Sequence, residues 1–393
     1  MLADSTAGLP RQERMLGLAA VIVASFFIGV SFGIGYPAAA FQLTKAGEAD
    51  WVVGLIGAAP SLGVLVALPF VPKIVRRFGA VATLAAGGAG AAVCYGVLAA
   101  VDSTAAWLLI RLVMGGAIAV SWLVSQTWMS CASDEVSRGR ALALYVMAFS
   151  SGMAVCPGLM DMLGVSGPLP LVAGAVASIL SIIPFVLVAR LAPSADTSDT
   201  GAGNVLKALS WVPVAMVGAF LAGFIELTHL SLLPTAGLAS GLDQSAVLLL
   251  LTLFLVGALT LQFAFGWLAD KLPTVQLTIT LAIILSAVCL LIPAALPVPL
   301  FGPIVIFAVG GLIYGLYTVA LAIVGELKNS ADTGPANAAF IMCYQAGGIA
   351  GPIIAGAVMS VDSMTGFVGI QVAACLLTAA IMIAAAKWLP QRT

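Results

Sequence analysis

The sequence predicts an all-α membrane protein whose twelve transmembrane helices form two pseudo-symmetric six-helix bundles. Three observations support this fold class: the composition, the length of the apolar runs and an internal duplication. Hydrophobic residues make up 62% of the 393 residues and charged residues only 8%, and the mean hydropathy is +1.16. Soluble domains carry about 25% charged residues. The composition therefore indicates an integral membrane protein.

Twelve apolar runs are long enough to cross a bilayer as helices, since one span needs about 20 apolar residues. A membrane β-barrel would instead show period-two alternation, which these runs lack. We expect spans over residues 15–39, 51–72, 79–100, 104–130, 138–162, 168–191, 210–236, 243–268, 275–294, 299–327, 335–360 and 364–388.

The duplication appears as landmarks that recur at one spacing. Gly115 is followed by Gly116 as Gly310 is followed by Gly311, 195 residues later (310 − 115). The basic turn PKIVRRFG at 72–79 matches GWLADKLP at 266–273, 194 residues later (266 − 72). Repetition at a fixed spacing indicates duplicated structure. Many secondary transporters are built from two membrane halves that are related in this way.

A polar segment separates the two halves. Residues 191–210 read LAPSADTSDTGAGNVLKALS, a Ser-, Thr-, Ala- and Gly-rich composition typical of a linker. We expect an N-terminal six-helix bundle at 1–191, a cytoplasmic linker at 192–209 and a C-terminal six-helix bundle at 210–393.

The basic residues predict the orientation, because Lys and Arg accumulate in cytoplasmic loops. With the N-terminus inside, the outer loops receive only Lys45, and Arg111 falls within a span. This asymmetry predicts cytoplasmic termini and an even number of spans. We expect a multi-pass protein of a bacterial inner membrane. The thirteen residues on the inner side are Arg11, Arg14, Lys73, Arg76, Arg77, Arg138, Arg140, Arg190, Lys207, Lys271, Lys328, Lys387 and Arg392.

Ionisable groups inside spans are the main functional candidates, because each costs about 2.5–3.5 kcal/mol or more at a helix centre. Arg111 could bind an anionic group or tune a nearby acid, or it could be a structural arginine. Glu226 could carry a proton through a transport cycle, or it could bond to His229 or a neighbouring helix for packing. His229 lies three residues from Glu226 on the same helix face, and a coupling role and a purely local hydrogen bond are equally good interpretations.

Polar and aromatic side chains of the spans could line a central cavity, and each could instead join two helices through a hydrogen bond. Tyr314, Gln126 and Gln345 are the better candidates for substrate binding, together with Arg111. The wider set is Tyr36, Trp122, Trp128, Tyr145, Gln262, Tyr317 and Tyr344, of which Tyr36 and Trp122 are also assigned to substrate binding.

The sequence contains no Walker A loop and no HExxH, and it has a single histidine. We therefore expect neither an enzyme nor a metal site or cofactor. The six cysteines stand singly, without a CxxC, and no basic patch suggests nucleic acid. The expected partners are a small-molecule substrate, protons and the lipid bilayer, and we expect a monomer.

Three segments resemble signatures of the major facilitator superfamily. GWLADKLP at 266–273 resembles the loop signature G-x-L-a-D-R/K-x-G, with proline in the last place. RLVMG at 111–115 resembles the R-x-x-x-G signature of span four, whose arginine the family implicates in proton coupling. GMAVCP at 152–157 resembles the G-x-x-x-G-P signature of proton-driven drug exporters, with Cys156 in place of the second glycine. The resemblance implies a twelve-helix, two-bundle rocker-switch transporter.

The resemblance also implies a cytoplasmic gate. In the second half, Gly266 and Asp270 belong to the loop signature, and Asp270 is expected to face the positive N-terminus of span five, near Arg138 and Arg140. In the first half, Arg76 stands where the family has aspartate. We therefore expect the gate to depend more on spans five and eight than on spans two and eleven.

Together these features predict a secondary active transporter, proton-coupled, that moves a small organic solute by alternating access, with Glu226 as coupling group. The partial span-five signature favours efflux by proton antiport. Uptake by proton symport, passive facilitation and a non-transporting sensor or scaffold stay open as alternatives.

Overall fold

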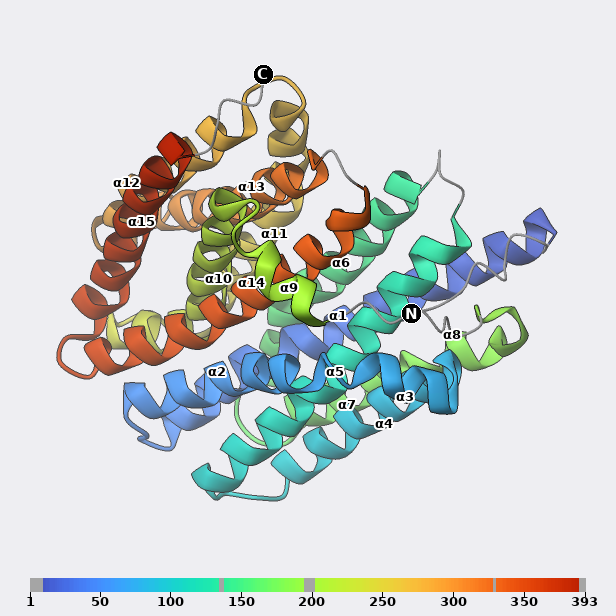
Figure 1. Cartoon of the computed structure of the whole chain (residues 1–393). Coiled ribbons are helices and arrows are strands. Elements are labelled where there is room, and N and C mark those ends of the chain that lie inside the picture. Colours follow the sequence, from blue (N-terminus) through green and yellow to red (C-terminus); the bar gives the residue numbers. More distant parts are fainter. Residues whose placement is uncertain (1–9, 134–137, 194–201, 328–329, 389–393) are drawn as a thin grey trace. The chain divides into compact units, whose positions relative to one another are not determined.

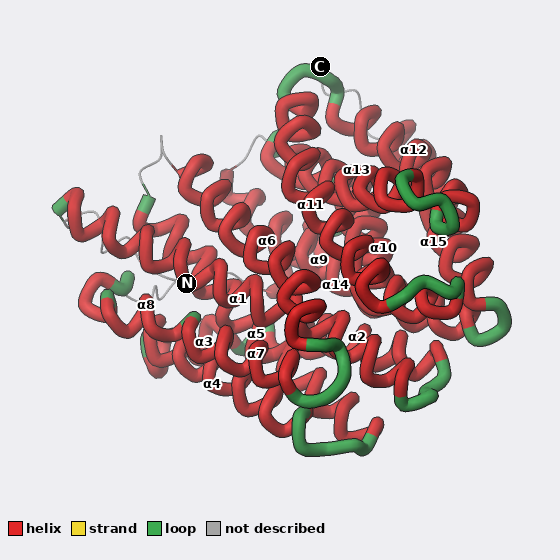
Figure 2. Tube along the Cα trace, turned by 180° about the vertical axis from the view of Figure 1, so that it is seen from behind, coloured by secondary structure: helices red, strands yellow, loops and turns green. Residues whose placement is uncertain are grey.

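The computed structural model describes residues 10–133, 138–193, 202–327 and 330–388, and in these ranges the chain is built from helices joined by short loops (Figures 1 and 2). The part before the linker contains α1 (Arg11–Lys45), α2 (Asp50–Ala67), α3 (Val71–Phe78), α4 (Ala80–Leu98), α5 (Thr104–Ala132), α6 (Arg138–Leu163), α7 (Leu169–Leu180), α8 (Ile182–Leu187) and a 3₁₀ turn (Ala189–Leu191). The remainder contains α9 (Ala202–Ala208), α10 (Pro213–Ala239), α11 (Gln244–Ala269), α12 (Thr274–Ala295), α13 (Phe301–Gly325), α14 (Ser330–Met359) and α15 (Ser363–Trp388).

Twelve of the described segments are long and apolar enough to cross a membrane, which confirms the predicted number of spans. The sixth span, Leu169–Leu187, consists of α7 and α8, which are interrupted at Ser181. Pro184 lies three residues after the interruption. Because proline lacks an N–H group and its ring crowds the preceding turn, it disturbs a helix at this position.

Two boundaries differ from the expectation. The first helix continues beyond residue 39 to Lys45 and ends before Gly47, whose φ of +78° is left-handed. The second span ends at Ala67 rather than 72, and the basic turn is the separate helix α3. Val71 and Val75 of α3 are buried while its basic residues are exposed, so α3 is amphipathic.

The chain divides into two compact units, which we call the first unit (Met1–Ala38 and Ala59–Asp199) and the second unit (Ala39–Ala58 and Thr200–Thr393). The second unit includes the end of α1 and the beginning of α2. There, Gly54 packs against Pro352 of α14, and Thr44 Oγ1 lies 2.9 Å from Thr235 Oγ1 of α10. The domain boundaries expected from the sequence stay a prediction.

Each unit repeats the same pair of close helix contacts. A β-carbon on any of the glycines concerned would overlap a carbonyl oxygen of the facing helix, so only glycine fits. In the first unit α2 meets α5 and α1 meets α6, and in the second unit α11 meets α13 and α10 meets α14. The glycine–carbonyl pairs are Gly63–Leu112, Gly115–Pro60, Gly29–Phe149 and Gly152–Phe26, followed by Gly257–Phe307, Gly310–Phe254, Gly223–Tyr344 and Gly347–Phe220. Corresponding residues are 194 or 195 positions apart (for example 257 − 63 and 347 − 152). The structural repeat confirms the duplication.

The linker contains a short helix that its composition does not predict. Residues 202–208 form α9, which contacts α14. Ala208 is fully buried although its neighbours Lys207 and Leu209 are exposed. The contact with α14 and the burial of Ala208 accompany helix formation in this part of the linker. Linker residues 194–201 lie outside the description.

Candidate functional site

Glu226 lies at the middle of α10, the most buried helix of the second unit. Side chains are buried along α10 on every side, and α11, α12, α13, α14 and α15 all contact it. A helix that is apolar all round belongs in a protein interior. Glu226 is 13 residues from each end of this helix (226 − 213 and 239 − 226), and its side chain is buried. The sequence therefore places a carboxyl at mid-membrane depth, enclosed by protein.

Two tyrosines hold the carboxyl of Glu226. Tyr314 of α13 donates a hydrogen bond to Oε1 at 2.6 Å, and Tyr344 of α14 donates one to Oε2 at 2.8 Å. Both tyrosines lie near the middle of their own helices. Each carboxyl oxygen thus receives one phenol donor, a suitable environment for an anion without a basic partner.

Further aromatic rings surround this carboxyl cluster of Glu226, Tyr314 and Tyr344. Tyr317 packs edge-on against Tyr344 at 5.6 Å between ring centroids and against Phe340 at 5.1 Å. Gln345, a predicted binding residue, follows Tyr344 on α14 and is buried. Of the residues predicted for the site, Glu226 and Tyr314 are in direct contact through the hydrogen bond described above.

His229 lies one turn after Glu226 but has different neighbours. Its Nδ1 donates to the carbonyl oxygen of Ile225 at 3.0 Å. Its ring stacks on Phe254, with centroids 5.0 Å apart and planes 9° apart, and meets the edge of Phe367 at 5.1 Å. The partners of Glu226 and of His229 do not overlap, so the structure does not join these two predicted coupling residues.

Arg111 lies on α5 in the first unit and is almost completely buried, with 1% of its surface exposed. Its Cζ is 4.8 Å from the ring centroid of Tyr36, and Nη1 is 3.7 Å from Sδ of Met114. Nε and Nη2 have no hydrogen-bond partner. The structure brings together the predicted residues Arg111 and Tyr36, and it places a cation with two unsatisfied donors inside the unit.

The other predicted binding residues of α5, Trp122 and Gln126, are half-buried near its second end. The carbonyl oxygen of Trp122 accepts a hydrogen bond from Tyr145 at 3.3 Å. Trp122 also packs against the first unit's core, in which Trp128 and Phe185 lie 5.7 Å apart. This packing supports a structural contribution from Trp122.

The predicted gate residues lie at helix ends. Asp270 is exposed directly after α11, and Gly266 is in the last turn of that helix. Next to Asp270, Lys271 Nζ lies 3.8 Å from the centroid of the Trp267 ring. Arg140 is exposed in the first turn of α6, while the side chain of Arg138 lies outside the description. A contact between Asp270 and the start of α6 stays a prediction.

The span-five signature is a helix contact in this structure. Gly152 packs against the backbone of Phe26. Cys156, one turn later, donates from Sγ to the carbonyl oxygens of Val30 and Gly152, each at 3.1 Å. At the equivalent place in the second unit, Gly351 packs against the carbonyl of Phe224. The exchange of glycine for cysteine therefore replaces close backbone packing with a thiol hydrogen bond.

Two residues that contact Glu226 or Arg111 are not among the predicted site residues: Tyr344 bonds to Glu226, and Met114 contacts Arg111. Tyr344 was noted only within the wider aromatic set, although its place at the middle of a span could have ranked it with Tyr314. Met114 follows Arg111 by three residues on one helix, so it lies on the same face. That spacing was the available signal.

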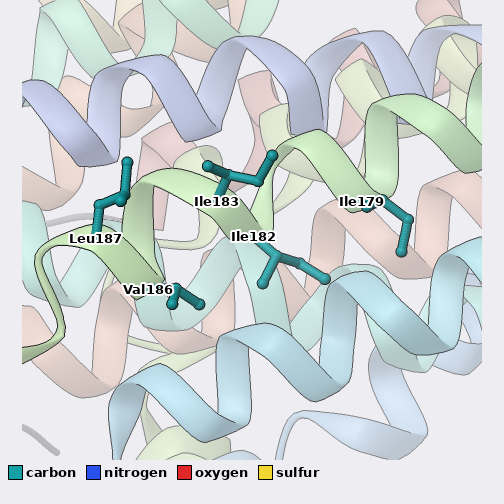
Figure 3. A pocket seen from close by; sticks show the side chains of 5 residues that line it. All are labelled: Ile179, Ile182, Ile183, Val186 and Leu187. Carbon is teal, nitrogen blue, oxygen red and sulfur yellow. The ribbon is translucent and has the colours of Figure 1, made fainter.

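An apolar hollow on α7 and α8 is a poor candidate for a solute site. Ile179, Ile182, Ile183, Val186 and Leu187 line it, and their side chains fan out from one helical segment (Figure 3). Four of the five are exposed large hydrophobics, the usual character of a lipid-facing surface. The hollow offers no polar group to orient a ligand.

Comparison with known proteins gives the family. The sequence profile described as Major Facilitator Superfamily matches residues 15–240 and 215–393. The chain is 26% identical over 333 residues to the uncharacterized MFS-type transporter YfkF of Bacillus subtilis, with 84% of this chain and 85% of YfkF covered. It is 24% identical over 330 residues to the uncharacterized MFS-type transporter YcaD of Salmonella heidelberg, with 81% and 82% covered.

Solved transporter structures share the fold. The nucleoside transporter NupG superposes with a TM-score of 0.76 at 14% identity, covering 95% of this chain and 99% of NupG. A bacterial homologue of the human lysosomal transporter Spinster gives 0.74 at 13% identity, covering 96% of both chains. The peptide transporter POT in complex with sulfate gives 0.73 at 13% identity, covering 94% of both. With its twelve spans, its structural repeat and a family match along nearly its whole length, the chain belongs to the major facilitator superfamily of membrane transporters.

Proposed function

We propose that this protein is a proton-coupled secondary active transporter that moves a small organic solute by alternating access, with export by proton antiport as the favoured direction. The observation that supports proton coupling is the carboxyl cluster at the centre of the second unit: Glu226 with one tyrosine donor on each oxygen. The direction is inferred from the span-five signature at residues 152–157.

The cluster can accommodate both protonation states of Glu226. An ionised carboxylate is an acceptor only, and both phenols donate to it in the observed arrangement. A protonated carboxyl carries one O–H donor, which one phenol can accept by rotating its own hydroxyl. The same three side chains therefore satisfy the acid and its anion without rearrangement of the helices.

The magnitudes show how an ionised carboxyl can exist at this depth. An ionisable group at mid-membrane depth costs about 2.5–3.5 kcal/mol or more, and hydrogen bonds to a charged group each contribute about 1.5–3 kcal/mol. Two such bonds offset a cost of this size. The ionised form of Glu226 is therefore tolerated at this depth without a basic partner.

Transport in proteoliposomes tests this proposal. Candidate solutes are added outside vesicles that contain purified protein and a pH-sensitive dye, with and without an imposed pH gradient. Under antiport, solute entry expels protons and raises the internal pH; under symport, it lowers the internal pH; and a passive facilitator leaves it unchanged.

Glu226→Gln preserves the size of the side chain and cannot exchange a proton, so it should lose the solute-dependent pH change. Glu326→Gln is the matched control, because Glu326 is exposed at the end of α13 and bonds to Thr274 at 2.8 Å. Full proton flux in Glu226→Gln would refute the proposal.

A further inference from the structure

The guanidinium of Arg111 has one engaged side and one free edge. On the engaged side, Nη1 meets Sδ of Met114 and the ring face of Tyr36 covers the cation. On the free edge, Nε and Nη2 are both buried and both lack a partner. Nε and Nη2 carry parallel N–H groups, the pair that binds a carboxylate or phosphate through two hydrogen bonds at once.

This free edge is energetically incomplete. Arginine keeps its charge in proteins, and its five N–H donors need acceptors. A thioether sulfur is a weak acceptor, and a buried donor without a partner is costly. No ion pair to Arg111 is found in the described ranges of the chain. An oxyanion with two acceptor oxygens would satisfy both donors at once.

The surroundings hold the guanidinium in one position. A β-carbon on Gly35 would lie 2.7 Å from Nη1, so the glycine makes room for the cation beside α1. The hydroxyl of Tyr95 donates to the carbonyl oxygen of Ser31, so it is already engaged as a donor. With one side packed, the edge that carries Nε and Nη2 is the part of Arg111 left to bind a ligand.

We propose that Nε and Nη2 of Arg111 bind an oxyanion of the transported solute, a carboxylate or a phosphate, so that the solutes are organic anions or carry one anionic group. This inference rests on the proposed transport function and names its substrate class. It assigns to Arg111 a binding role that is separate from the proton exchange at Glu226.

Ligand binding in detergent tests this assignment without any gradient, so its result does not depend on proton coupling. Sodium acetate and sodium phosphate are titrated against sodium chloride at equal ionic strength, and the thermal unfolding temperature is followed. Acetate, phosphate or both should raise it above the chloride value. Acetate alone points to carboxylates, and phosphate alone points to phosphate esters.

Variants locate the effect. Arg111→Lys keeps the charge but removes the paired donors, so half-saturation should need about tenfold more anion, which corresponds to one lost hydrogen bond. Arg111→Gln should abolish the effect. Arg190→Gln removes an exposed positive charge and should leave the response unchanged.

A second readout is measured on the unmodified protein. The methyl group of Met114 adjoins the guanidinium, so its ¹³C resonance in methionine-labelled protein should shift during the same titration. The resonance is assigned from Met114→Leu. The proposal is overturned if neither anion raises the unfolding temperature of the unmodified protein or moves this resonance, or if Arg111→Gln responds as the unmodified protein does.

Discussion

Gly115 of α5 packs so closely on α2 that a β-carbon on it would overlap the carbonyl oxygen of Pro60. A backbone oxygen cannot move aside as a side chain can. Gly115→Ala should therefore destabilise the protein by about 1–3 kcal/mol through overpacking, seen as a lower unfolding temperature in detergent. Its neighbour supplies the control, because a β-carbon on Gly116 would lie 3.6 Å from Ala67 Cβ, an ordinary contact. Equal unfolding temperatures for Gly115→Ala and Gly116→Ala would contradict this packing.

Replacing either tyrosine donor of Glu226 should move the pH dependence of transport. Tyr314→Phe or Tyr344→Phe removes a donor from the deprotonated carboxylate. The protonated form then persists to higher pH, so the pH of half-maximal transport should rise. A hydrogen bond to a charged group is worth about 1.5–3 kcal/mol, so the rise should be about one pH unit or more.

Tyr317→Phe is the matched control for these two variants, since the ring contacts of Tyr317 with Phe340 and Tyr344 survive the loss of the hydroxyl. Its transport should keep the pH profile of the unmodified protein. If Tyr317→Phe and Tyr314→Phe shift the profile equally, the hydrogen bonds to Glu226 are not the cause.

His229→Leu should affect stability rather than proton coupling. The substitution removes the stacking on Phe254 and the hydrogen bond to Ile225. Aromatic contacts of this kind are worth about 0.5–1.5 kcal/mol, so the unfolding temperature should fall modestly. The carboxyl cluster stays intact, and the pH profile of transport should too. A shift of that profile as large as the shift in Tyr314→Phe would show that His229 takes part in coupling.

Two aspartates at opposite ends of α11 should respond differently. Asp243 caps the helix, because its side chain accepts a hydrogen bond from the Ala246 amide at 2.7 Å. Asp243→Ala should therefore cost about 1 kcal/mol of stability, seen as a lower unfolding temperature.

Asp270 is exposed at the other end of α11. If it closes the cytoplasmic gate, Asp270→Asn should reduce transport at an unchanged unfolding temperature. Transport at the rate of the unmodified protein in Asp270→Asn would remove Asp270 from the gate.

The sequence was sufficient for the number of spans and for the duplication, because hydrophobic length and repeated glycines are local features of the chain. Glu226 and Arg111 could be identified for a similar reason, as rare charges within apolar runs. Tyr344 could not be joined to Glu226, since 118 residues separate them (344 − 226) and the contact depends on how α10 packs with α14.

Glu226 and His229 lie on the same face of α10 but have different neighbours, so a shared helix face did not predict a shared environment. Residues three apart in a helix point in directions about 60° apart. On a helix with one buried stripe they would share neighbours. Because α10 is buried all round, this small rotation is enough to give Glu226 two tyrosines and His229 two phenylalanines.

The hairpin at residues 39–58 has a consequence for biosynthesis. Gly54 packs against Pro352. During synthesis, 298 further residues must be translated after Gly54 before Pro352 is added (352 − 54). At about 5–20 residues per second, this delay is roughly 15–60 s. Throughout that interval the exposed glycine surface of the hairpin has to be shielded by lipid or by the insertion machinery, so the N-terminal half reaches its final packing only after the penultimate span has been translated.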